Sequence, residues 1–383
     1  MPTIVYLVHG MGCGSADGSA PKPGSEWHVP VKAAVEMICD RFGLAKREWL
    51  EPKTTTLPKQ RGHDALWFVP VSYHRVFDDF RAKSTDRQAL LDSLKIPNLQ
   101  FFDPSNPKKN EFLWKNCLDV LLWWSDLVET RPWVTAEILE SMRSVDALSD
   151  RLPKSTRVRR IVIAHSLGTA ASTYALRKVG STPEYRAARR VERFVTLANV
   201  APFLLDESTD VYAAPMIAED DDTLLQGMVN ARHEWDPIPW LMPWRHWRVE
   251  NAGEWRPRWE QAVQSGQLLQ PVTRGIVAPP GSTPSAFDVH AFSNYLLARE
   301  TAPLLAAMFR GGAYSSSELA KIDWDGAWNT QAVQFRCAGD PLWDEHLREA
   351  VEQYADESDS RQTQLVARLL RAAEILVAQA EKC

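Results

Sequence analysis

Short runs of apolar, β-branched residues recur along this chain and predict the strands of a sheet. The first run, Ile4 to Val8, passes directly into a glycine turn at His9-Gly10. Further runs of the same kind predict strands over residues 66–72, 158–164, 194–198 and 227–231. Proline lacks the N–H that a central strand needs, so Pro70 indicates an edge position or a bulge in the second run.

Segments in which apolar residues recur every three or four positions separate these runs. They predict helices over residues 29–42, 134–148, 167–178 and 291–309, and a long amphipathic helical tail over residues 341–380. Strands that alternate with helices indicate an α/β fold, a mostly parallel central sheet with helices on both faces. Ligands of such sheets bind at the carboxyl ends of the strands, so the candidates for chemistry are side chains that directly follow a strand.

Two regions interrupt this alternation. Residues 74–133 are a mixed insertion, with a loop at residues 97–109 and an amphipathic helical segment at residues 111–124. Residues 241–285 are rich in Trp, Arg and Pro and have little periodicity. We expect one α/β domain over residues 1–310, with the helical insertion as either a lid or part of the core, and a C-terminal helical extension over residues 311–383.

The composition is that of a globular protein with a sizeable core, with 45% hydrophobic and 24% charged residues among 383. A net charge of -5 argues against a nucleic-acid-binding protein, whose binding face is usually basic. The five cysteines show no CxxC spacing, which argues against a disulfide framework or a zinc site. We see neither a signal peptide nor a membrane-spanning run, so we expect a cytoplasmic protein without stable membrane insertion.

The 16 tryptophans gather mainly in residues 114–133 and 235–259. Rigid aromatic side chains of this kind either fill a large core or line an apolar substrate cleft. In the second group, arginines interleave with the tryptophans. That alternation fits a solvated stack on the core, a docking surface for a partner, or a site for an anionic headgroup.

The most informative stretch runs from Arg160 to Ala170. Its apolar, β-rich part ends in Ala164-His165-Ser166-Leu167-Gly168, and a helical pattern of small residues follows at once. A serine between a strand and a helix, with small residues two positions before and after it, is typical of a nucleophile elbow. Strain in such a turn lifts the hydroxyl clear of the sheet. Ser166 is therefore the candidate nucleophile.

A nucleophilic serine needs a base that takes its proton and an acid that fixes the tautomer of the base. In this fold class the order along the chain is serine, acid, histidine, and four histidines follow Ser166. His290 lies at a loop-to-helix junction late in the chain, where the base is expected. His233 lies at a strand end close to the acid candidate, His246 is flanked by arginines, and His346 lies on a solvated helix face. We expect His290 to be the base, with a structural histidine as the alternative.

Asp236 is the candidate acid. It follows the predicted strand at residues 227–231, and the two prolines close behind it restrict the backbone of a residue that must hold an imidazole still. The competing candidates are Asp206 and Asp210, which follow the preceding strand. We expect Asp288, two residues before His290, to cap or orient the local turn.

Two backbone N–H groups are expected to stabilise the oxyanion of the reaction. One belongs to Leu167 and comes with the elbow. The second is expected in the loop His9-Gly10-Met11-Gly12, where Met11 is the candidate and a purely geometric glycine turn is the alternative. A phosphate-binding loop is disfavoured, because the lysine and the glycine spacing of such loops are missing. We expect neither a cofactor nor a metal site.

Four motifs together resemble the α/β-hydrolase superfamily, in its lipase and esterase branch. They are Val8-His9-Gly10-Met11, Ala164-His165-Ser166-Leu167-Gly168, Asp236-Pro237-Ile238-Pro239, and His290 followed by Tyr295. The last two are similar to the class 3 lipases, which include the fungal triacylglycerol lipases. The resemblance implies Ser166 as nucleophile, Asp236 as acid, His290 as base, and Met11 and Leu167 as oxyanion donors. The chain departs from the family at Ala164, where glycine is commoner, and at His233, where the family has asparagine.

These residues favour a serine hydrolase that cleaves a carboxylic ester, from a small molecule or a lipid, through an acyl-enzyme intermediate. The insertion then becomes a possible lid over an acyl pocket. Phospholipase and acyltransferase reactions use the same three residues and remain open. The alternative from a different class is a non-catalytic interaction protein on a hydrolase scaffold, with partners docking on residues 240–259. Acyl length, headgroup and oligomeric state are not determined by the sequence.

Overall fold

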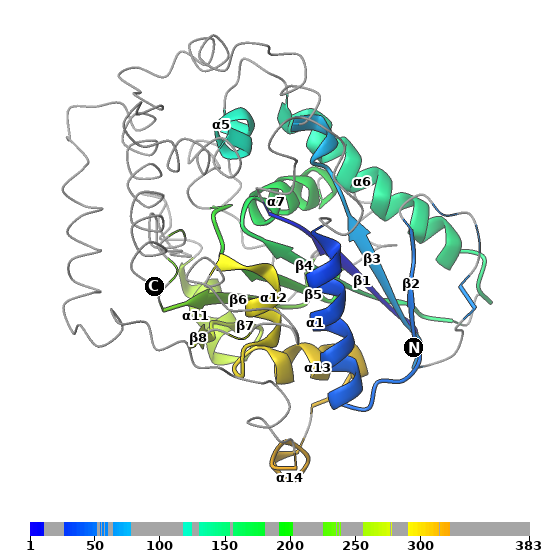
Figure 1. Ribbon diagram of the computed structural model, residues 1–383, viewed down its shortest axis with the longest axis vertical. Coiled ribbons are helices and arrows are strands. Elements are labelled where there is room, and N and C mark those ends of the chain that lie inside the picture. Colours follow the sequence, from blue (N-terminus) through cyan, green and yellow to red (C-terminus); the bar gives the residue numbers. More distant parts are fainter. Residues whose placement is uncertain are drawn as a thin grey trace, which may run out of the picture.

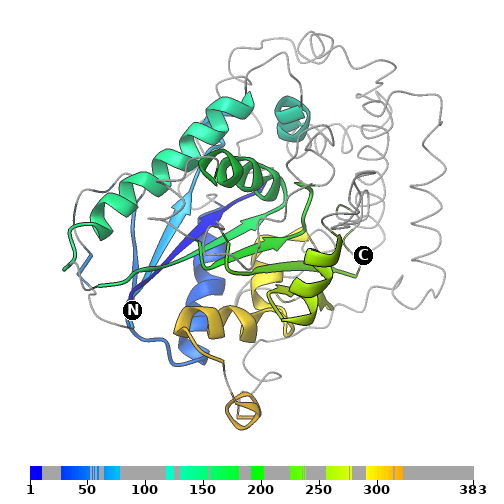
Figure 2. The same ribbon diagram turned by 180° about the vertical axis from the view of Figure 1, so that it is seen from behind.

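A parallel β-sheet forms the centre of the molecule (Figures 1 and 2). The strand order is β2-β3-β1-β4-β5-β6-β7, and β8 pairs with β6 as well. The computed structural model describes residues 1–10, 27–51, 54, 56, 58–59, 64–77, 118–124, 130–153, 156–180, 191–201, 225–234, 236, 238, 256–275, 277, 290–313 and 315–321. Within these residues every pair of named strands is parallel.

All five predicted strands are present, within two residues of their expected bounds. The strands are β1 (Thr3–Val8), β2 (Arg47–Trp49), β3 (Leu66–Val71), β4 (Arg159–His165), β5 (Arg193–Leu197), β6 (Met228–His233), β7 (Leu268–Leu269) and β8 (Val272–Thr273). The sequence does not predict β2, β7 or β8, because two or three residues are too few to show a period. Pro70 lies two residues past the last pair that β3 makes with β2, so among the described residues it borders β1 alone.

Helices cover both faces of the sheet. The described helices are α1 (His28–Arg41), α5 (Leu118–Trp124), α6 (Thr130–Ser149), α7 (Leu167–Gly180), α11 (Arg256–Gln264), α12 (Phe292–Leu297), α13 (Ala302–Arg310) and α14 (Ser316–Leu319). Figure 1 shows α1, α12 and α13 over one face, and the reverse view in Figure 2 shows α6 and α7 over the other. The predicted α/β architecture is confirmed.

The single helix predicted over residues 291–309 is wrong, because the chain forms two helices there. Ala298 ends α12 with an extended ψ of 140°, and Thr301 precedes α13. Pro303 explains the break, since its ring has no N–H and clashes with the carbonyl four residues earlier in a continuous helix. The Thr301 hydroxyl has one proton to donate, and it contacts the carbonyls of both Tyr295 and Ala298 at the end of α12.

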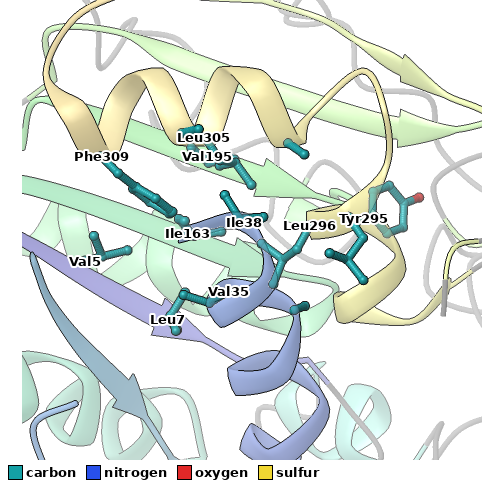
Figure 3. Close-up of a cluster of buried hydrophobic side chains, with 14 of the residues drawn as sticks. Val5, Leu7, Val35, Ile38, Ile163, Val195, Tyr295, Leu296, Leu305 and Phe309 are labelled. Carbon is teal, nitrogen blue, oxygen red and sulfur yellow. The ribbon is translucent and has the colours of Figure 1, made fainter. Parts of the chain in front are cut away.

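Successive strand residues point to opposite faces, and both faces are buried. Tyr6 points toward α6, where its hydroxyl donates to the carboxylate of Asp146 at 3.3 Å. Its neighbours Val5 and Leu7 point toward α1 and α13. Figure 3 shows this second face, where both pack with side chains of two other strands and of α1, α12 and α13, among them Val35, Ile38, Ile163, Val195, Leu296, Leu305 and Phe309. Burial of each such apolar side chain stabilises the fold by roughly 1.5–3 kcal/mol.

Ion pairs hold β4 in place on both sides of the sheet. Arg160 donates to the fully buried carboxylate of Asp146 on α6 at 2.7 Å. Arg159 pairs with Glu192, directly before β5, and donates to the carbonyl of Met308 on α13 at 2.8 Å. Since loss of one partner of a buried pair leaves an uncompensated charge, these contacts fix the strand that ends at the candidate nucleophile.

The insertion and the C-terminal extension are described only in part. Residues 78–117 and 125–129 lie outside the described residues, and the last four residues of the predicted insertion belong to α6, which begins at Thr130 rather than at 134. Beyond residue 310 the description covers α14, capped by Ser315, and ends at residue 321, so the tail at 341–380 stays a prediction. In the region expected to lack periodicity, α11 is a short polar helix. None of the described helices has both the length and the apolar character to cross a bilayer.

Candidate active site

Ser166 occupies a sharp turn between β4 and α7. Its φ is +51°, and only Ala198 shares a positive φ among the described residues other than glycine. The left-handed conformation costs a non-glycine residue about 1 kcal/mol or more, so neighbouring contacts must hold it. The N–H of Ser166 donates to the carbonyl of Leu197 at 3.0 Å, and its carbonyl accepts from the N–H of Thr169 at 2.8 Å. The strand-turn-helix geometry predicted for this motif is therefore present.

Two glycines make room for this turn. A Cβ on Gly168 would lie 2.1 Å from the carbonyl oxygen of His9, because the first turn of α7 lies directly on the end of β1. A Cβ on Gly10 would lie 2.6 Å from the Cβ of Ser166. Glycine is thus required at Gly168 by the close approach of the β1 backbone and at Gly10 by the close approach of the Ser166 Cβ.

Gly168→Ala should lower the free energy of unfolding by about 3 kcal/mol or more, because a methyl group cannot be placed beside a strand carbonyl without moving α7. Gly312 is the matched control, since a Cβ there meets no atom within 4 Å. Gly312→Ala should change stability by no more than about 0.5 kcal/mol. Urea denaturation measures both, and equal effects of the two substitutions would contradict the packing described for the turn.

The structure brings Ser166, His290 and Asp236 together into one hydrogen-bonded chain. His290 Nε2 lies 2.9 Å from Ser166 Oγ, and His290 Nδ1 lies 2.7 Å from Asp236 Oδ2. Ser166 and Asp236 are buried, and the His290 side chain is 15% exposed. In a neutral imidazole, Nδ1–H then donates to the carboxylate while Nε2 accepts the serine proton. This tautomer is the one that can remove a proton from Ser166.

Asp236 accepts hydrogen bonds from three directions. His290 Nδ1 and the hydroxyl of Tyr295, at 2.8 Å, both donate to Oδ2, and the N–H of Ile238 donates to Oδ1 at 3.0 Å. A fully buried carboxylate needs such donors to remain charged. Burial, together with the nearby charge of Asp236, raises the pKa of Tyr295 well above its usual value. The phenol therefore keeps its proton and stays a donor.

Two further buried histidines lie near this chain. His165 stacks on Phe292 with ring centroids 5.0 Å apart, and its ring lies 4.9 Å from that of His290. His233, considered above as a base, lies instead at the end of β6, with Nε2 2.7 Å from the carbonyl oxygen of Gly275. Burial lowers the pKa of both His165 and His233. Both rings therefore stay neutral near pH 7, which leaves His290 as the described histidine placed to take the serine proton.

His9 packs against the turn at Ser166 from the end of β1. Its Nδ1 contacts the carbonyl of Gly10, and its ring stacks on Tyr73 with centroids 4.3 Å apart. The Tyr73 hydroxyl donates to the His9 carbonyl at 2.8 Å. Burial, and then repulsion from His74, lowers the pKa of His9 to about 3. This histidine is thus a neutral structural element at the carboxyl end of β1.

The lowered pKa of His9 predicts an acid-labile fold. The unfolded chain takes up this proton near pH 6.5 and the folded chain only near pH 3, so the contribution of His9 to stability falls as the pH drops through that window and is fully present above it. At pH 5 the loss from His9 is about 2 kcal/mol. In His9→Asn, the decrease in unfolding free energy between pH 7.5 and pH 5, measured in urea, should be smaller than in the wild type by about this amount. Equal decreases would contradict the assignment.

The structure describes one of the two predicted oxyanion donors. Leu167 is the first residue of α7, and the first N–H groups of a helix have no partner within it. The positive end of the helix dipole lies at the same place, beside Ser166. Met11 lies outside the described residues and stays a predicted donor. The other residues considered as acid, base or turn residues also lie outside the described residues. They are Asp206, Asp210, His246, Asp288 and His346.

No match to this chain is found among models of known protein families, curated proteins or solved structures. The candidate site is therefore defined by its own geometry. Within the described part of the chain, no three His, Cys, Asp or Glu side chains lie together in a way that could hold a metal ion.

Two contributions to the site are not predicted from the sequence. Tyr295 is predicted only as part of a motif, without a role, and no role is predicted for the ring of His165. The spacing from His290 to Tyr295, slightly more than one helical turn, was the available signal for the first. The second had no signal beyond the position of His165 next to the serine.

Proposed function

We propose that this chain is a serine hydrolase of the α/β-hydrolase superfamily, in its lipase and esterase branch, and that it cleaves carboxylic esters through an acyl-enzyme intermediate. The observation that carries the proposal is the hydrogen-bonded chain from Ser166 through His290 to Asp236. It lies beyond the carboxyl ends of β4 and β6, where ligands of parallel sheets bind. The order along the sequence is serine, aspartate, histidine, as in enzymes with a nucleophile elbow.

Acylation begins when Ser166 Oγ attacks the carbonyl carbon of the ester and its proton passes to His290 Nε2. The imidazolium that forms is stabilised by the charge of Asp236 across Nδ1. The tetrahedral intermediate carries its negative charge on the former carbonyl oxygen, which the N–H of Leu167 and the predicted donor Met11 stabilise. The intermediate collapses, and the alcohol leaves with the proton from His290. Ser166 then carries the acyl group as an ester.

Deacylation repeats these steps with water as the nucleophile. His290 takes a proton from the water, whose oxygen attacks the acyl carbon of Ser166. The same donors stabilise the second oxyanion. Collapse breaks the acyl–Oγ bond, and the proton on His290 returns to Ser166 Oγ. The carboxylic acid is released, and the starting state is restored.

The proposed substrate is an ester of a small molecule or a lipid, and no cofactor takes part. Of the three hydrogen-bonded residues, His290 is the one whose side chain is partly exposed, so substrate would reach the site from the surface beside this ring. The alternative of a docking protein depends on residues 240–259, of which the structure describes only the start of α11. Hydrolysis is preferred because hydrogen bonds join the buried carboxylate of Asp236 to the imidazole of His290, and that imidazole to the hydroxyl of the strained Ser166.

Release of p-nitrophenol from a series of p-nitrophenyl acyl esters tests the proposal. The purified chain should hydrolyse at least the short acyl esters with multiple turnovers, in the absence of any added metal or cofactor. A folded chain that hydrolyses none of the series faster than buffer would contradict the proposed reaction.

A further inference from the structure

Tyr295 lies on α12, which begins two residues after His290. Its side chain is fully buried, and its ring packs at the edge of the apolar cluster with the hydroxyl pointing away from the apolar side chains (Figure 3). The hydroxyl reaches the end of β6. There it accepts the backbone N–H of His233 at 2.9 Å and donates to Asp236 Oδ2 at 2.8 Å.

The direction of these two bonds is fixed by chemistry. A backbone N–H can only donate, so the contact with His233 uses a lone pair of the phenol oxygen. The single proton of the hydroxyl is then committed to Asp236. It arrives at Oδ2, the oxygen that His290 Nδ1 also contacts. The Tyr295 hydroxyl and the His290 imidazole therefore both donate to the same carboxylate oxygen, whose negative charge stabilises a protonated His290.

We propose that Tyr295 is a positioning residue for the proposed hydrolysis, which holds Asp236 Oδ2 in line with His290 and limits how strongly that carboxylate attracts a proton to the imidazole. The inference rests on the proposed function. Without the hydroxyl, the carboxylate has one donor fewer and attracts the imidazolium more strongly. His290 then becomes neutral, and competent as a base, only at higher pH.

The charged and titratable groups around this pair come from several elements. They are His165 at the end of β4, Arg232 and His233 on β6, Glu234 directly after β6, and Glu300 after α12. Burial keeps the two histidines neutral near pH 7, because it lowers the pKa of each. Tyr295→Phe changes none of these residues, so a changed pH dependence would report the lost hydroxyl.

The test compares Tyr295→Phe with Tyr6→Phe. Tyr6 is the matched control, since it is a fully buried tyrosine whose hydroxyl donates to another buried carboxylate, Asp146, on the opposite face of the sheet. Tyr295→Phe should lower kcat for a p-nitrophenyl ester about tenfold with KM within twofold. The acid limb of its kcat/KM profile should move to higher pH by about half a unit to one unit. Tyr6→Phe should lower the Tm but leave the acid limb unchanged.

A second substitution tests the same inference if Tyr295→Phe does not fold. Incorporation of 3-fluorotyrosine at position 295 preserves the shape and makes the hydroxyl a stronger donor, so the acid limb should move to lower pH. An acid limb that coincides with the wild type in the variant that folds would overturn the inference. So would a shift of equal size in Tyr6→Phe.

Nuclear magnetic resonance of 15N-histidine-labelled protein separates this inference from the proposed function. The pH midpoint of the His290 ring signals, assigned by their loss in His290→Asn, should be higher in Tyr295→Phe than in the wild type. This readout needs no turnover. An unchanged midpoint overturns the inference even if esters are hydrolysed, while a wild-type chain inactive on every ester overturns the proposed function alone.

Discussion

Replacing Ser166 with alanine is expected to reduce kcat for p-nitrophenyl ester hydrolysis by about 10⁴-fold to 10⁶-fold, to the level of the buffer reaction. The hydroxyl is the nucleophile of both half-reactions, and no other described hydroxyl lies within hydrogen-bonding distance of His290 Nε2. The substitution removes one oxygen and leaves the Cβ that the turn already accommodates. The fold should therefore be retained.

Ser172 provides the matched control for this experiment. It lies on α7 and is buried, and its hydroxyl has no hydrogen-bond partner among the described residues. Ser172→Ala should keep activity within about twofold of the wild type, because it removes a buried hydroxyl that takes no part in the chemistry. Circular dichroism and Tm confirm the fold of both variants. Substantial ester hydrolysis by Ser166→Ala, above a tenth of the wild type, would contradict the mechanism.

Replacing His290 with alanine is expected to be nearly as damaging, at about 10⁴-fold or more in kcat. His290 serves as base when it takes the proton of Ser166 and as acid when it protonates the leaving alcohol, so both transition states lose their proton carrier. Asp236 cannot replace it, because the imidazole separates that carboxylate from the hydroxyl. Steady-state rates with a short-chain p-nitrophenyl ester measure the effect.

The double variant Ser166→Ala/His290→Ala sharpens this prediction. Residues that act as one unit have non-additive effects, so the double variant should be no slower than either single variant within about threefold. If the two losses multiply instead, Ser166 and His290 contribute independently. That result would contradict a shared proton transfer, even if each single variant were inactive.

The sequence predicts β4, the turn at Ser166 and the start of α7, because each of them leaves a clear local pattern of residues. A buried parallel strand is apolar throughout, so β4 gives a clear signal, and the small residues at 164, 168 and 170 fit a tight turn onto a helix. The shortest strands and the polar helix α11 give no comparable signal. The break between α12 and α13 was predictable in principle from Pro303, but the apolar periodicity continues through it.

The sequence located the three candidate residues by chain order rather than by distance. Asp236 and His290 lie 54 residues apart, and Ser166 and His290 lie 124 residues apart. No local pattern carries the information that the strands bring them together. The contact between Tyr295 and Asp236 depends on the same long-range packing, and so does the donor role of a hydroxyl at the end of β6. Distances and donor directions therefore needed the structure, while residue types and their order did not.

Covalent labelling with a fluorophosphonate probe tests the central claim most directly, because such probes react with a serine only where a base activates it. The folded wild-type chain should take up one label, located by fragment spectra to Ser166 within the tryptic peptide that runs from residue 161 to 177. Ser166→Ala should take up none, His290→Ala should label far more slowly, and Ser172→Ala should label like the wild type. A folded wild-type chain that leaves Ser166 unlabelled, or that carries the label on another serine, would contradict the proposed active site.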